Sequence, residues 1–330
     1  MMRVLVTGGA GFIGSHLSEV LVARGDTVTV LDDFSTGRID NLGQLPASPR
    51  CRLVRGTVLD RDLVRGLVGP SDAVVHLASP VGVGLIVEHP LQSVRTIIHG
   101  TESVLDAAVE NGTRVLVAST SEVYGKNTGL LHEEADRLCG PSTVPRWSYA
   151  TAKAIDEFLA FGFWQERGLP AVVLRYFNTV GPRQLGSYGM VLPRFVARAL
   201  LGEDLVVYGD GRQQRCFCHV ADAVRATVGL LDNAEAPGKA FNIASEEEVT
   251  ILDLADRVLA LTGSASRVRL VPSRTVYGDH FEDMVRRRPD TRRIRELLDW
   301  APAHSLDSTV KDVVNEALRV GPRSLLTRTT

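Results

Sequence analysis

A tyrosine and a lysine stand four residues apart in the stretch 148–153 (SYATAK). Residues at this spacing share one face of a helix, so the phenol of Tyr149 and the ammonium of Lys153 are expected to be neighbours. An adjacent ammonium stabilises a phenolate and is expected to lower a tyrosine pKa that is ordinarily about 10. Such a tyrosine can take the proton of an alcohol while a bound acceptor takes the hydride. The spacing alone more often marks an ordinary helix-surface pair, so the rest of the chain must decide.

A glycine-rich turn near the N-terminus favours the chemical interpretation. The apolar run 3–7 (RVLVT) is followed by Gly8, Gly11 and Gly14, and then by a pattern typical of a helix. Glycines let the backbone approach a pyrophosphate, whose charge is met by the helix N-terminus. Strand, turn and helix in this order predict the phosphate cradle of a βαβ unit.

Two acidic residues follow the next strand-like run, 27–31 (TVTVL). Asp32 and Asp33 stand where an acid accepts hydrogen bonds from ribose hydroxyls and repels a 2′-phosphate. The sequence therefore predicts a site for NAD rather than NADP. Together with Tyr149 and Lys153, this site indicates a nicotinamide oxidoreductase.

Strand-like apolar runs alternate with segments of helical length through the first half of the chain. This alternation is typical of the α/β class, a Rossmann-like doubly wound parallel sheet with helices on both faces. After Asn178 the alternation breaks. We therefore expect an NAD-binding domain over residues 1–178, to which residues 217–243 return, and a smaller α/β substrate-binding lobe formed mainly by 179–330. The strand-like runs are 52–55, 73–77, 114–118 and 171–175.

The composition disfavours several classes of binding partner, namely nucleic acids, metal ions and membranes. The 330 residues carry a net charge of −2, and this balance does not favour nucleic-acid binding. The four cysteines have too few further ligands nearby for a metal site, so we expect no metal and reduced thiols in a cytoplasmic protein. A strand begins almost at residue 1, and no apolar stretch is long enough to span a membrane, so neither a signal peptide nor a membrane partner is expected. The cysteines are Cys51, Cys139, Cys216 and Cys218.

These motifs together resemble the extended short-chain dehydrogenase/reductase family of nucleotide-sugar epimerases, dehydratases and decarboxylases, over about residues 1–300. The resemblance implies a tightly held NAD that is reduced and reoxidised within one turnover. It also implies a catalytic hydroxyl after the fourth strand, which matches Thr120 and would hydrogen-bond the sugar oxygen. The implied catalytic set is Thr120, Ser121, Glu122, Tyr149 and Lys153. The implied NAD contacts are Gly8, Gly11, Phe12, Ile13, Gly14, Asp32, Asp33, Ser35, Thr36, Gly37, Leu77, Ala78, Ser79, Tyr149 and Lys153.

Within the family, the residues after Thr120 favour some reactions over others. Dehydratases and decarboxylases place a glutamate at the position of Glu122, whereas simple 4-epimerases rarely need an acid there. Deoxythymidine-diphosphate-glucose dehydratases pair this glutamate with an aspartate, and here Ser121 stands in that place, so their elimination is disfavoured. GDP-mannose-type 4,6-dehydratases carry Thr-Ser-Glu and stay open.

Other stretches are similar to UDP-glucuronate decarboxylases, also called UDP-xylose synthases. These stretches are 76–80 (HLASP), 116–125 (LVASTSEVYG), 177–183 (FNTVGPR), 287–290 (RRPD) and 298–300 (LDW). By this resemblance, Asn178 and Arg215 contact the diphosphate, and Arg287 reaches the diphosphate or the sugar carboxylate, since a guanidinium meets two oxygens at once. The implied contacts to the UDP-sugar are Asn178, Val191, Arg194, Tyr208, Arg215 and Arg287.

Three departures keep a nucleotide-sugar 4-epimerase, acting on UDP-glucuronate or UDP-glucose, as the alternative. The residues between Tyr149 and Lys153 are closer to those of many epimerases. The stretch 186–191 (GSYGMV) also resembles an epimerase-like group, and Thr57 stands where an acid often contacts adenine. A nucleotide-binding homologue without chemistry is disfavoured because the catalytic set is intact.

The favoured reaction is decarboxylation of UDP-glucuronate. Tyr149, helped by Lys153, removes the 4-hydroxyl proton while NAD takes the hydride, and the resulting 4-ketone lets the carboxylate leave as carbon dioxide. Ser121 and Glu122 would organise the carboxylate region or the reprotonation, giving UDP-xylose and/or UDP-4-keto-xylose. The family also implies a helix-pair homodimer. Segments 101–110 and 149–167 could form it through apolar residues such as Leu105, Ile155 and Leu159, although the same residues could equally be buried against the sheet.

Overall fold

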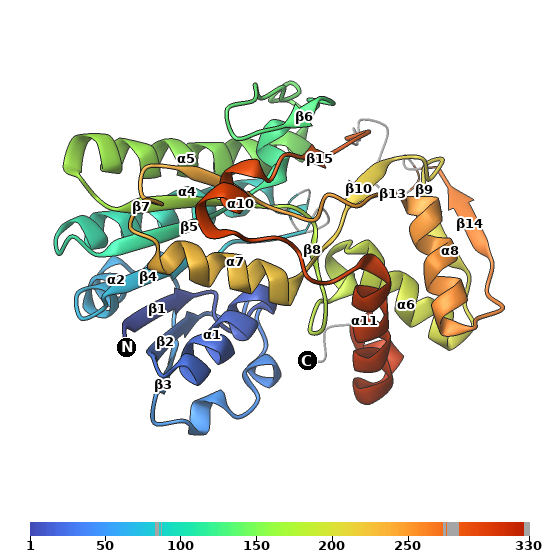
Figure 1. Cartoon of the computed structure of the whole chain (residues 1–330), viewed down its shortest axis with the longest axis horizontal. Coiled ribbons are helices and arrows are strands. Elements are labelled where there is room, and N and C mark those ends of the chain that lie inside the picture. Colours follow the sequence, from blue (N-terminus) through green and yellow to red (C-terminus); the bar gives the residue numbers. More distant parts are fainter. Residues whose placement is uncertain (83–85, 87, 273–274, 276–283, 327–330) are drawn as a thin grey trace.

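The computed structural model describes residues 1–82, 86, 88–272, 275 and 284–326. A parallel sheet with the strand order β12-β7-β5-β4-β1-β2-β3 forms its centre (Figure 1). The predicted Rossmann-like α/β class is thereby confirmed, and each of the four strand-like runs supplies a strand. The inner runs 73–77, 114–118 and 171–175 are mostly apolar because both faces of the sheet are covered there, whereas the run 52–55 forms an edge strand and carries two arginines. The strands are β1 (Arg3–Thr7), β2 (Thr27–Asp32), β3 (Cys51–Arg55), β4 (Ala73–His76), β5 (Arg114–Thr120), β7 (Ala171–Tyr176) and β12 (Ala240–Ile243).

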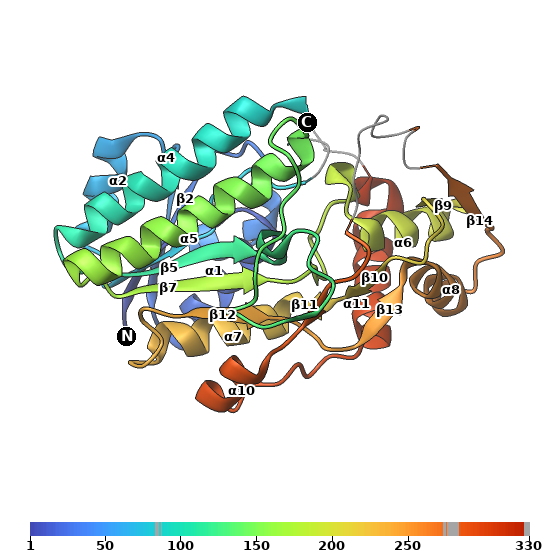
Figure 2. The same ribbon diagram turned by 90° about the horizontal axis from the view of Figure 1, so that it is seen from above.

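Helices cover both faces of this sheet (Figure 2). Successive strand residues point to opposite faces, so Val4 and Val6 of β1 pack in the core with α1 and α7, whereas Leu5 packs in the core with α2, α4 and α5. The helices of the first face are α1 (Phe12–Arg24) and α7 (Val220–Asp232), and those of the second are α2 (Arg61–Val68), α4 (Pro90–Val109) and α5 (Ser148–Arg167).

A second group of elements lies beside the carboxyl end of the sheet and has its own core (Figure 1). The antiparallel pair β10–β13 and the parallel pair β9–β14 accompany three helices there. The chain leaves this group to form α7 and β12, and β12 pairs with β7 in the central sheet. The elements are α6 (Val191–Leu201), β9 (Leu205–Tyr208), β10 (Gln214–Cys216), β13 (Glu248–Thr250), α8 (Ile251–Thr262), β14 (Val268–Val271) and α11 (Leu306–Val320).

Short elements connect the two groups. Two of them, β6 (Leu130–Leu131) and β15 (Arg288–Pro289), pair with each other in parallel, and β8 (Thr179–Val180) pairs with β11 (Cys218–His219). The 3-10 turn η3 (Ser121–Tyr124) follows β5 directly, and a second 3-10 turn, η4 (Pro145–Trp147), precedes α5. The short helix α10 (Arg292–Leu298) follows β15. The turn η3 and the strand β15 carry residues to the same end of the sheet.

Two of the three apolar residues named for a helix-pair interface, Leu105 and Leu159, pack against the core between these helices and the sheet. Leu105 is fully buried in the core between α4 and the sheet, the second of the two places that the sequence left open for it. The side chain of Leu105 faces the sheet. The sequence pattern did not distinguish an apolar residue on this inner face of the helix from one on its outer face. Ile155 on α5 is partly exposed at 37%.

Among the described residues, none of the helices has the length and apolar character needed to cross a membrane.

Candidate active site

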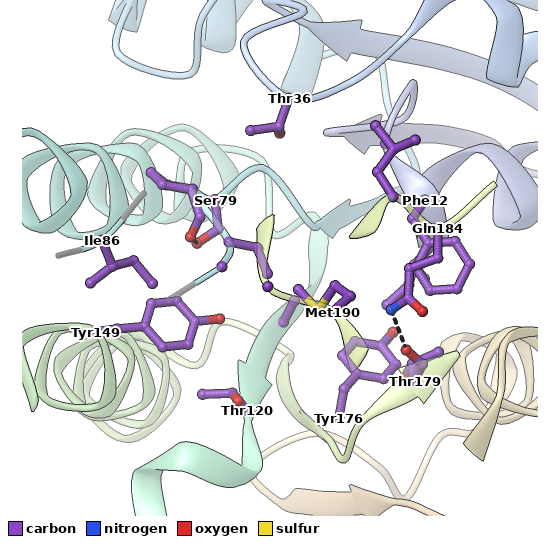
Figure 3. Close-up of a pocket in the computed structure, with 18 of the residues that line it drawn as sticks. Phe12, Thr36, Ser79, Ile86, Thr120, Tyr149, Tyr176, Thr179, Gln184 and Met190 are labelled. Atoms are coloured by element: carbon purple, nitrogen blue, oxygen red, sulfur yellow. Dashed lines mark hydrogen bonds between the residues drawn. The ribbon is translucent and has the colours of Figure 1, made fainter. Parts of the chain in front are cut away.

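A cavity of about 600 Å³ opens at the carboxyl ends of β1, β4 and β5, where the strand order reverses. Ligands bind at this switch point in doubly wound sheets. Tyr149 from α5 and Thr120 at the end of β5 point into the same space, with Phe12 and Thr36 on other sides (Figure 3). All of the site residues expected from the sequence line this cavity except Gly37.

The glycine turn forms the floor at one end of the cavity. Gly8 has a φ of +69°, and a Cβ at this position would lie 2.8 Å from the backbone nitrogen of Ala78. A Cβ at Gly14 would lie only 2.2 Å from the carbonyl oxygen of Gly8. Helix α1 begins here without a side-chain cap or an acidic residue in its first turn. Its N–H groups and partial positive charge therefore fit the pyrophosphate of a dinucleotide.

The two acids after β2 have different surroundings. Asp32 is buried, and its carboxylate accepts hydrogen bonds from the backbone N–H groups of Ala10 (2.9 Å) and Phe34 (2.8 Å). Burial raises the pKa of Asp32 in spite of these bonds. Asp33 is exposed and lines the cavity. Gly37 does not line the cavity, because it lies against the Asp32 carboxylate. A Cβ added to Gly37 would be 2.7 Å from Asp32 Oδ1. A direct contact of Gly37 with the cofactor is therefore not supported.

Tyr149 and Lys153 share a helix face as expected, but their electrostatics differ from the prediction. The hydroxyl of Tyr149 is hydrogen-bonded to Thr120, while Lys153 Nζ donates to the carbonyl oxygen of Ala118 (3.0 Å) and to Asp156 (3.1 Å). Burial raises the pKa of Tyr149, and the carboxylates of Glu122 and Asp156 raise it further. The expected low pKa of Tyr149 is wrong for this arrangement, because burial outweighs the nearby ammonium of Lys153, which is itself paired with Asp156.

Glu122 is held by two arginines at the other side of Tyr149. Arg146 meets both carboxylate oxygens with its two Nη atoms, and Arg287 Nη2 donates to Oε1 at 3.1 Å. Arg287 Nη1 also lies 3.3 Å from the hydroxyl of Ser121. Burial by itself would raise the pKa of Glu122, but the charges of Arg146 and Arg287 together outweigh it and lower the pKa to about 2. The glutamate is therefore a carboxylate at any physiological pH.

This cluster shows where Arg287 lies in the site. It also contains Arg146, which was not among the residues predicted from the sequence. The sequence left Arg287 between the diphosphate and the sugar carboxylate, and its contacts lie with Ser121 and Glu122 beside Thr120. Arg146 is 5% exposed and lines the cavity. Its signal in the sequence was its place three residues before Tyr149, in the 3-10 turn η4 that leads directly into α5.

The remaining predicted substrate contacts also line the cavity. Asn178 has a φ of +20° and donates from Nδ2 to the carbonyl oxygen of Cys216 (3.1 Å), which fixes the loop after β7. Arg215 on β10 is buried. Val191 begins α6, and the guanidinium of Arg194 lies 4.5 Å from the ring centre of Tyr208. An aromatic ring and a cation in this geometry offer a flat surface and a positive charge to a nucleotide.

Comparisons with known proteins agree with this geometry. The model of the NAD dependent epimerase/dehydratase family matches residues 4–244. A UDP-N-acetyl-alpha-D-glucosaminuronate decarboxylase of Bacillus cytotoxicus is 41% identical over 94% of this chain and 96% of its own. A UDP-glucuronic acid decarboxylase of Arabidopsis thaliana is 34% identical over 96% of this chain and 69% of its own. A Bacillus cereus UDP-glucuronic acid 4-epimerase, solved with UDP-glucuronic acid and NAD, superposes with a TM-score of 0.87 at 27% identity, covering 97% and 100% of the two chains.

Proposed function

Because the chain belongs to the NAD dependent epimerase/dehydratase family, as its motifs predicted, we propose that it is an NAD-dependent decarboxylase of a UDP-linked hexuronate. UDP-glucuronate is the proposed substrate, and the products are UDP-xylose and/or UDP-4-keto-xylose. NAD is the cofactor of the family, and the glycine turn with its uncapped helix fits it.

The observation that carries this proposal is the pair of arginines around Glu122. Two guanidinium groups and one carboxylate leave a local charge of +1 beside Thr120 and Tyr149. A uronate brings the compensating negative charge, whereas the neutral hexose of a UDP-glucose epimerase does not. Both arginines already bond to Glu122, so they would hold a substrate carboxylate only partly. A loosely held carboxylate is free to leave as carbon dioxide.

The proposed mechanism assigns one task to each residue. When bound, NAD supplies the acceptor that takes the hydride from C4 of the sugar and returns it. Tyr149 would take the proton of the 4-hydroxyl as its phenolate, a form that the positive nicotinamide ring of a bound NAD and the nearby Lys153 would favour over the buried phenol of the cofactor-free site. Thr120, already bonded to the tyrosine hydroxyl, donates to the sugar oxygen as charge develops on it. Lys153 holds the end of β5 through the carbonyl oxygen of Ala118 and keeps a positive charge near the tyrosine.

After oxidation, the carbonyl at C4 is beta to the carboxylate, so the electrons of the breaking C5–C6 bond pass into an enolate. Thr120 and Tyr149 hydrogen-bond this oxygen in the proposal. Ser121 and the Glu122–Arg287 pair position the carboxylate. Asn178 and Arg215 hold the diphosphate, and Val191, Arg194 and Tyr208 hold the nucleoside.

A second substrate is favoured by one comparison. The Bacillus cytotoxicus relative is named for the 2-acetamido analogue of the same uronate. Decarboxylation depends on C4, C5 and C6 and not on the substituent at C2, so the same residues would act on either sugar. A 4-epimerase of UDP-glucuronate, represented among the similar structures, is the alternative reaction.

The deciding experiment is to incubate the pure protein with NAD and, in parallel, UDP-glucuronate or UDP-N-acetylglucosaminuronate, and to identify products by mass spectrometry. Loss of carbon dioxide supports the decarboxylase and identifies the sugar. An unchanged mass with conversion to the C4 epimer in chromatography supports the epimerase. The matched control is Tyr149→Phe, which removes only the proton acceptor and should lower turnover at least about a thousandfold. Near-normal activity of this variant would refute the assignment.

We also propose that the chain forms a homodimer through α5. Ile155, Phe158 and Trp164 of this helix are 37%, 65% and 38% exposed, and Ile155 and Phe158 are adjacent on its outer face. Light scattering should give a dimer for the natural chain and a monomer for Phe158→Glu. Glu134→Gln, which removes an exposed surface charge paired with Arg293, serves as the control. A dimeric Phe158→Glu variant would argue against this interface.

The remaining expectations stay proposals. We propose that residues 1–178 and 217–243 bind NAD and that the rest of 179–330 binds the UDP-sugar. All four cysteines are free thiols, which supports the proposed cytoplasmic location.

A further inference from the structure

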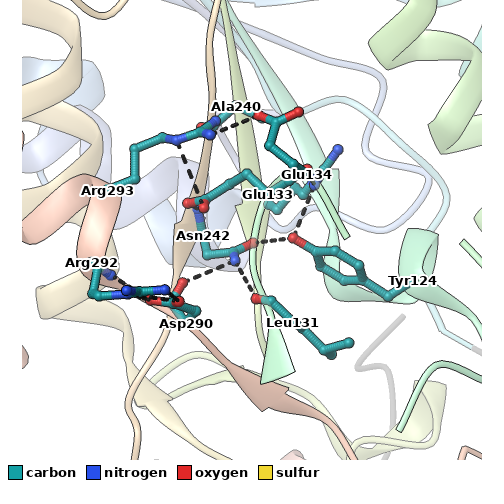
Figure 4. A network of polar contacts seen from close by, with 10 residues as sticks. Tyr124, Leu131, Glu133, Glu134, Ala240, Asn242, Asp290, Arg292 and Arg293 are labelled. Atoms are coloured by element: carbon teal, nitrogen blue, oxygen red, sulfur yellow. Dashed lines mark hydrogen bonds and ion pairs between the residues drawn. The ribbon is translucent and has the colours of Figure 1, made fainter. Parts of the chain in front are cut away.

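One buried amide, that of Asn242 on β12, joins three other segments of the chain (Figure 4). Asn242 is fully buried and does not line the cavity. It lies on an edge strand of the central sheet, where apolar side chains fill most positions. A polar side chain in such a place is stable only when its donors and acceptors are satisfied.

The amide of Asn242 satisfies three neighbours at once. Its Oδ1 accepts a hydrogen bond from the hydroxyl of Tyr124 (2.8 Å), and its Nδ2 donates to the carbonyl oxygens of Leu131 (2.8 Å) and Asp290 (3.0 Å). One acceptor and two donors are the groups that an asparagine amide offers to three such partners. Its backbone N–H is also bonded, to Glu133 Oε1 (2.9 Å).

These bonds reach the backbone on both sides of the Glu122–Arg287 pair. Tyr124 ends the turn η3, which contains Glu122, and Asp290 lies three residues after Arg287. The strand pairing between β15 and β6 covers only two residues on each strand. So short a pairing fixes the register weakly by itself. Asn242 adds a side-chain bond to Asp290 and, through Tyr124, ties the same point to the turn.

From this arrangement we propose that Asn242 is a positioning residue that sets the distance between Arg287 and Glu122 and thereby the rate of carbon dioxide loss. The kinetic part rests on the proposed function. Thr120, Tyr149 and Lys153 receive no bond from Asn242, so hydride transfer should depend on it little. An ordinary structural asparagine would instead affect both steps equally through the amount of folded protein.

The test replaces Asn242 by aspartate, which keeps the shape and the acceptor for Tyr124. It places a negative oxygen against the carbonyl oxygens of Leu131 and Asp290, so the β15 segment is pushed away. The matched control is Asn233→Asp, because Asn233 uses only its side-chain oxygen, as an acceptor for the N–H of Glu235. In a single turnover with carboxyl-labelled substrate, NADH absorbance reports hydride transfer and released label reports decarboxylation.

For Asn242→Asp, NADH formation should stay within about twofold of the natural protein, and release of carbon dioxide should slow about tenfold or more, the change expected from one misplaced hydrogen-bonded contact. In an Arg287→Lys background, the same replacement should slow this release no further, since both changes act on one contact. Equal slowing of both steps, or additive effects in the double variant, would overturn the proposal.

Hydrogen exchange tests the positioning without any substrate. In Asn242→Asp the amide of Asp290, which donates to the carbonyl oxygen of Leu131 at 3.0 Å, should exchange faster, while amides of β4 should not change. Unchanged exchange at Asp290 would refute the proposal. If the natural protein turns over no uronate, the proposed function fails, and this exchange result still decides the role of Asn242. Should Asn242→Asp not fold, Tyr124→Phe removes one of the three bonds and should give the same pattern with a smaller change.

Discussion

The replacement Glu122→Gln should destabilise the protein strongly at neutral pH and hardly at all in acid. Glutamine has the shape of a protonated glutamate, so it removes the negative charge and keeps the volume. In the natural protein the carboxylate of Glu122 accepts hydrogen bonds from Arg146 and Arg287, and the Glu122 side chain is only 13% exposed. Without this carboxylate, two guanidinium groups face each other with no counter-charge, which is costly in a buried site.

The magnitude follows from the pKa of Glu122. The pKa falls from an ordinary 4.5 to about 2 in the folded protein. This difference of about 2.5 units, at about 1.4 kcal/mol for each unit, corresponds to about 3 kcal/mol of stabilisation at neutral pH. Because the folded pKa is the lower one, the stabilisation is complete above pH 4.5 and is lost as the pH falls toward 2. The difference between the natural protein and the variant should therefore shrink over the same interval.

Urea unfolding at a series of pH values between 3 and 7 measures this difference directly. The control is Glu134→Gln, whose carboxylate pairs with Arg293 but has a side chain that is 74% exposed. Exposed pairs contribute less than about 1 kcal/mol, so the control should stay close to the natural protein throughout. A difference of less than about 1 kcal/mol for Glu122→Gln at pH 7, or one that does not depend on pH, would refute the electrostatic reasoning.

Three further predictions concern neighbouring parts of the site. Absorbance of the cofactor-free protein at 295 nm should show no difference between the natural chain and Tyr149→Phe up to pH 10, because burial keeps this phenol protonated; a tyrosinate signal below that pH would contradict the raised pKa. Gly14→Ala should weaken NAD binding in calorimetry at least about a hundredfold, since its Cβ would overlap the Gly8 carbonyl, whereas Gly66→Ala, with open space around it, should bind normally. Arg146→Lys keeps a charge but not the two-pronged contact with Glu122, so single-turnover release of carbon dioxide should slow about tenfold, and unchanged release would remove Arg146 from the site.

Local patterns in the sequence predicted the parts of the molecule that depend on neighbours in the chain. The alternation of apolar runs gave the parallel sheet because a strand buried on both faces must be apolar along its length. The glycine turn could be located because a Cβ at Gly8 or Gly14 would meet the backbone, a constraint that leaves a visible mark on residue choice. Tyr149 and Lys153 share a helix face, and a spacing of four residues is enough to say so.

Contacts between distant segments left no such mark. Asn242 meets Tyr124 across 118 residues, and Arg287 meets Glu122 across 165. Neither spacing has a period that a sequence pattern could reveal. The neutralisation of Lys153 by Asp156 was local and could have been anticipated from its spacing of three residues. The sequence does not show which of its helical neighbours Lys153 pairs with. That depends on the burial of both side chains, which is set by the packing of α5 against the sheet.

The opposite pKa shifts of Glu122 and Tyr149 separate the roles that the sequence left open for the glutamate. With a pKa of about 2, only about one Glu122 in 10⁵ carries a proton at pH 7, so it cannot serve as an effective proton donor. Tyr149 is protonated in the same site because burial disfavours its anion. Once Tyr149 has released its own proton and taken that of the 4-hydroxyl, it is the group able to give a proton back. The pair therefore favours Glu122 as the fixed anion that orients Arg146 and Arg287, and it leaves proton transfer to Tyr149.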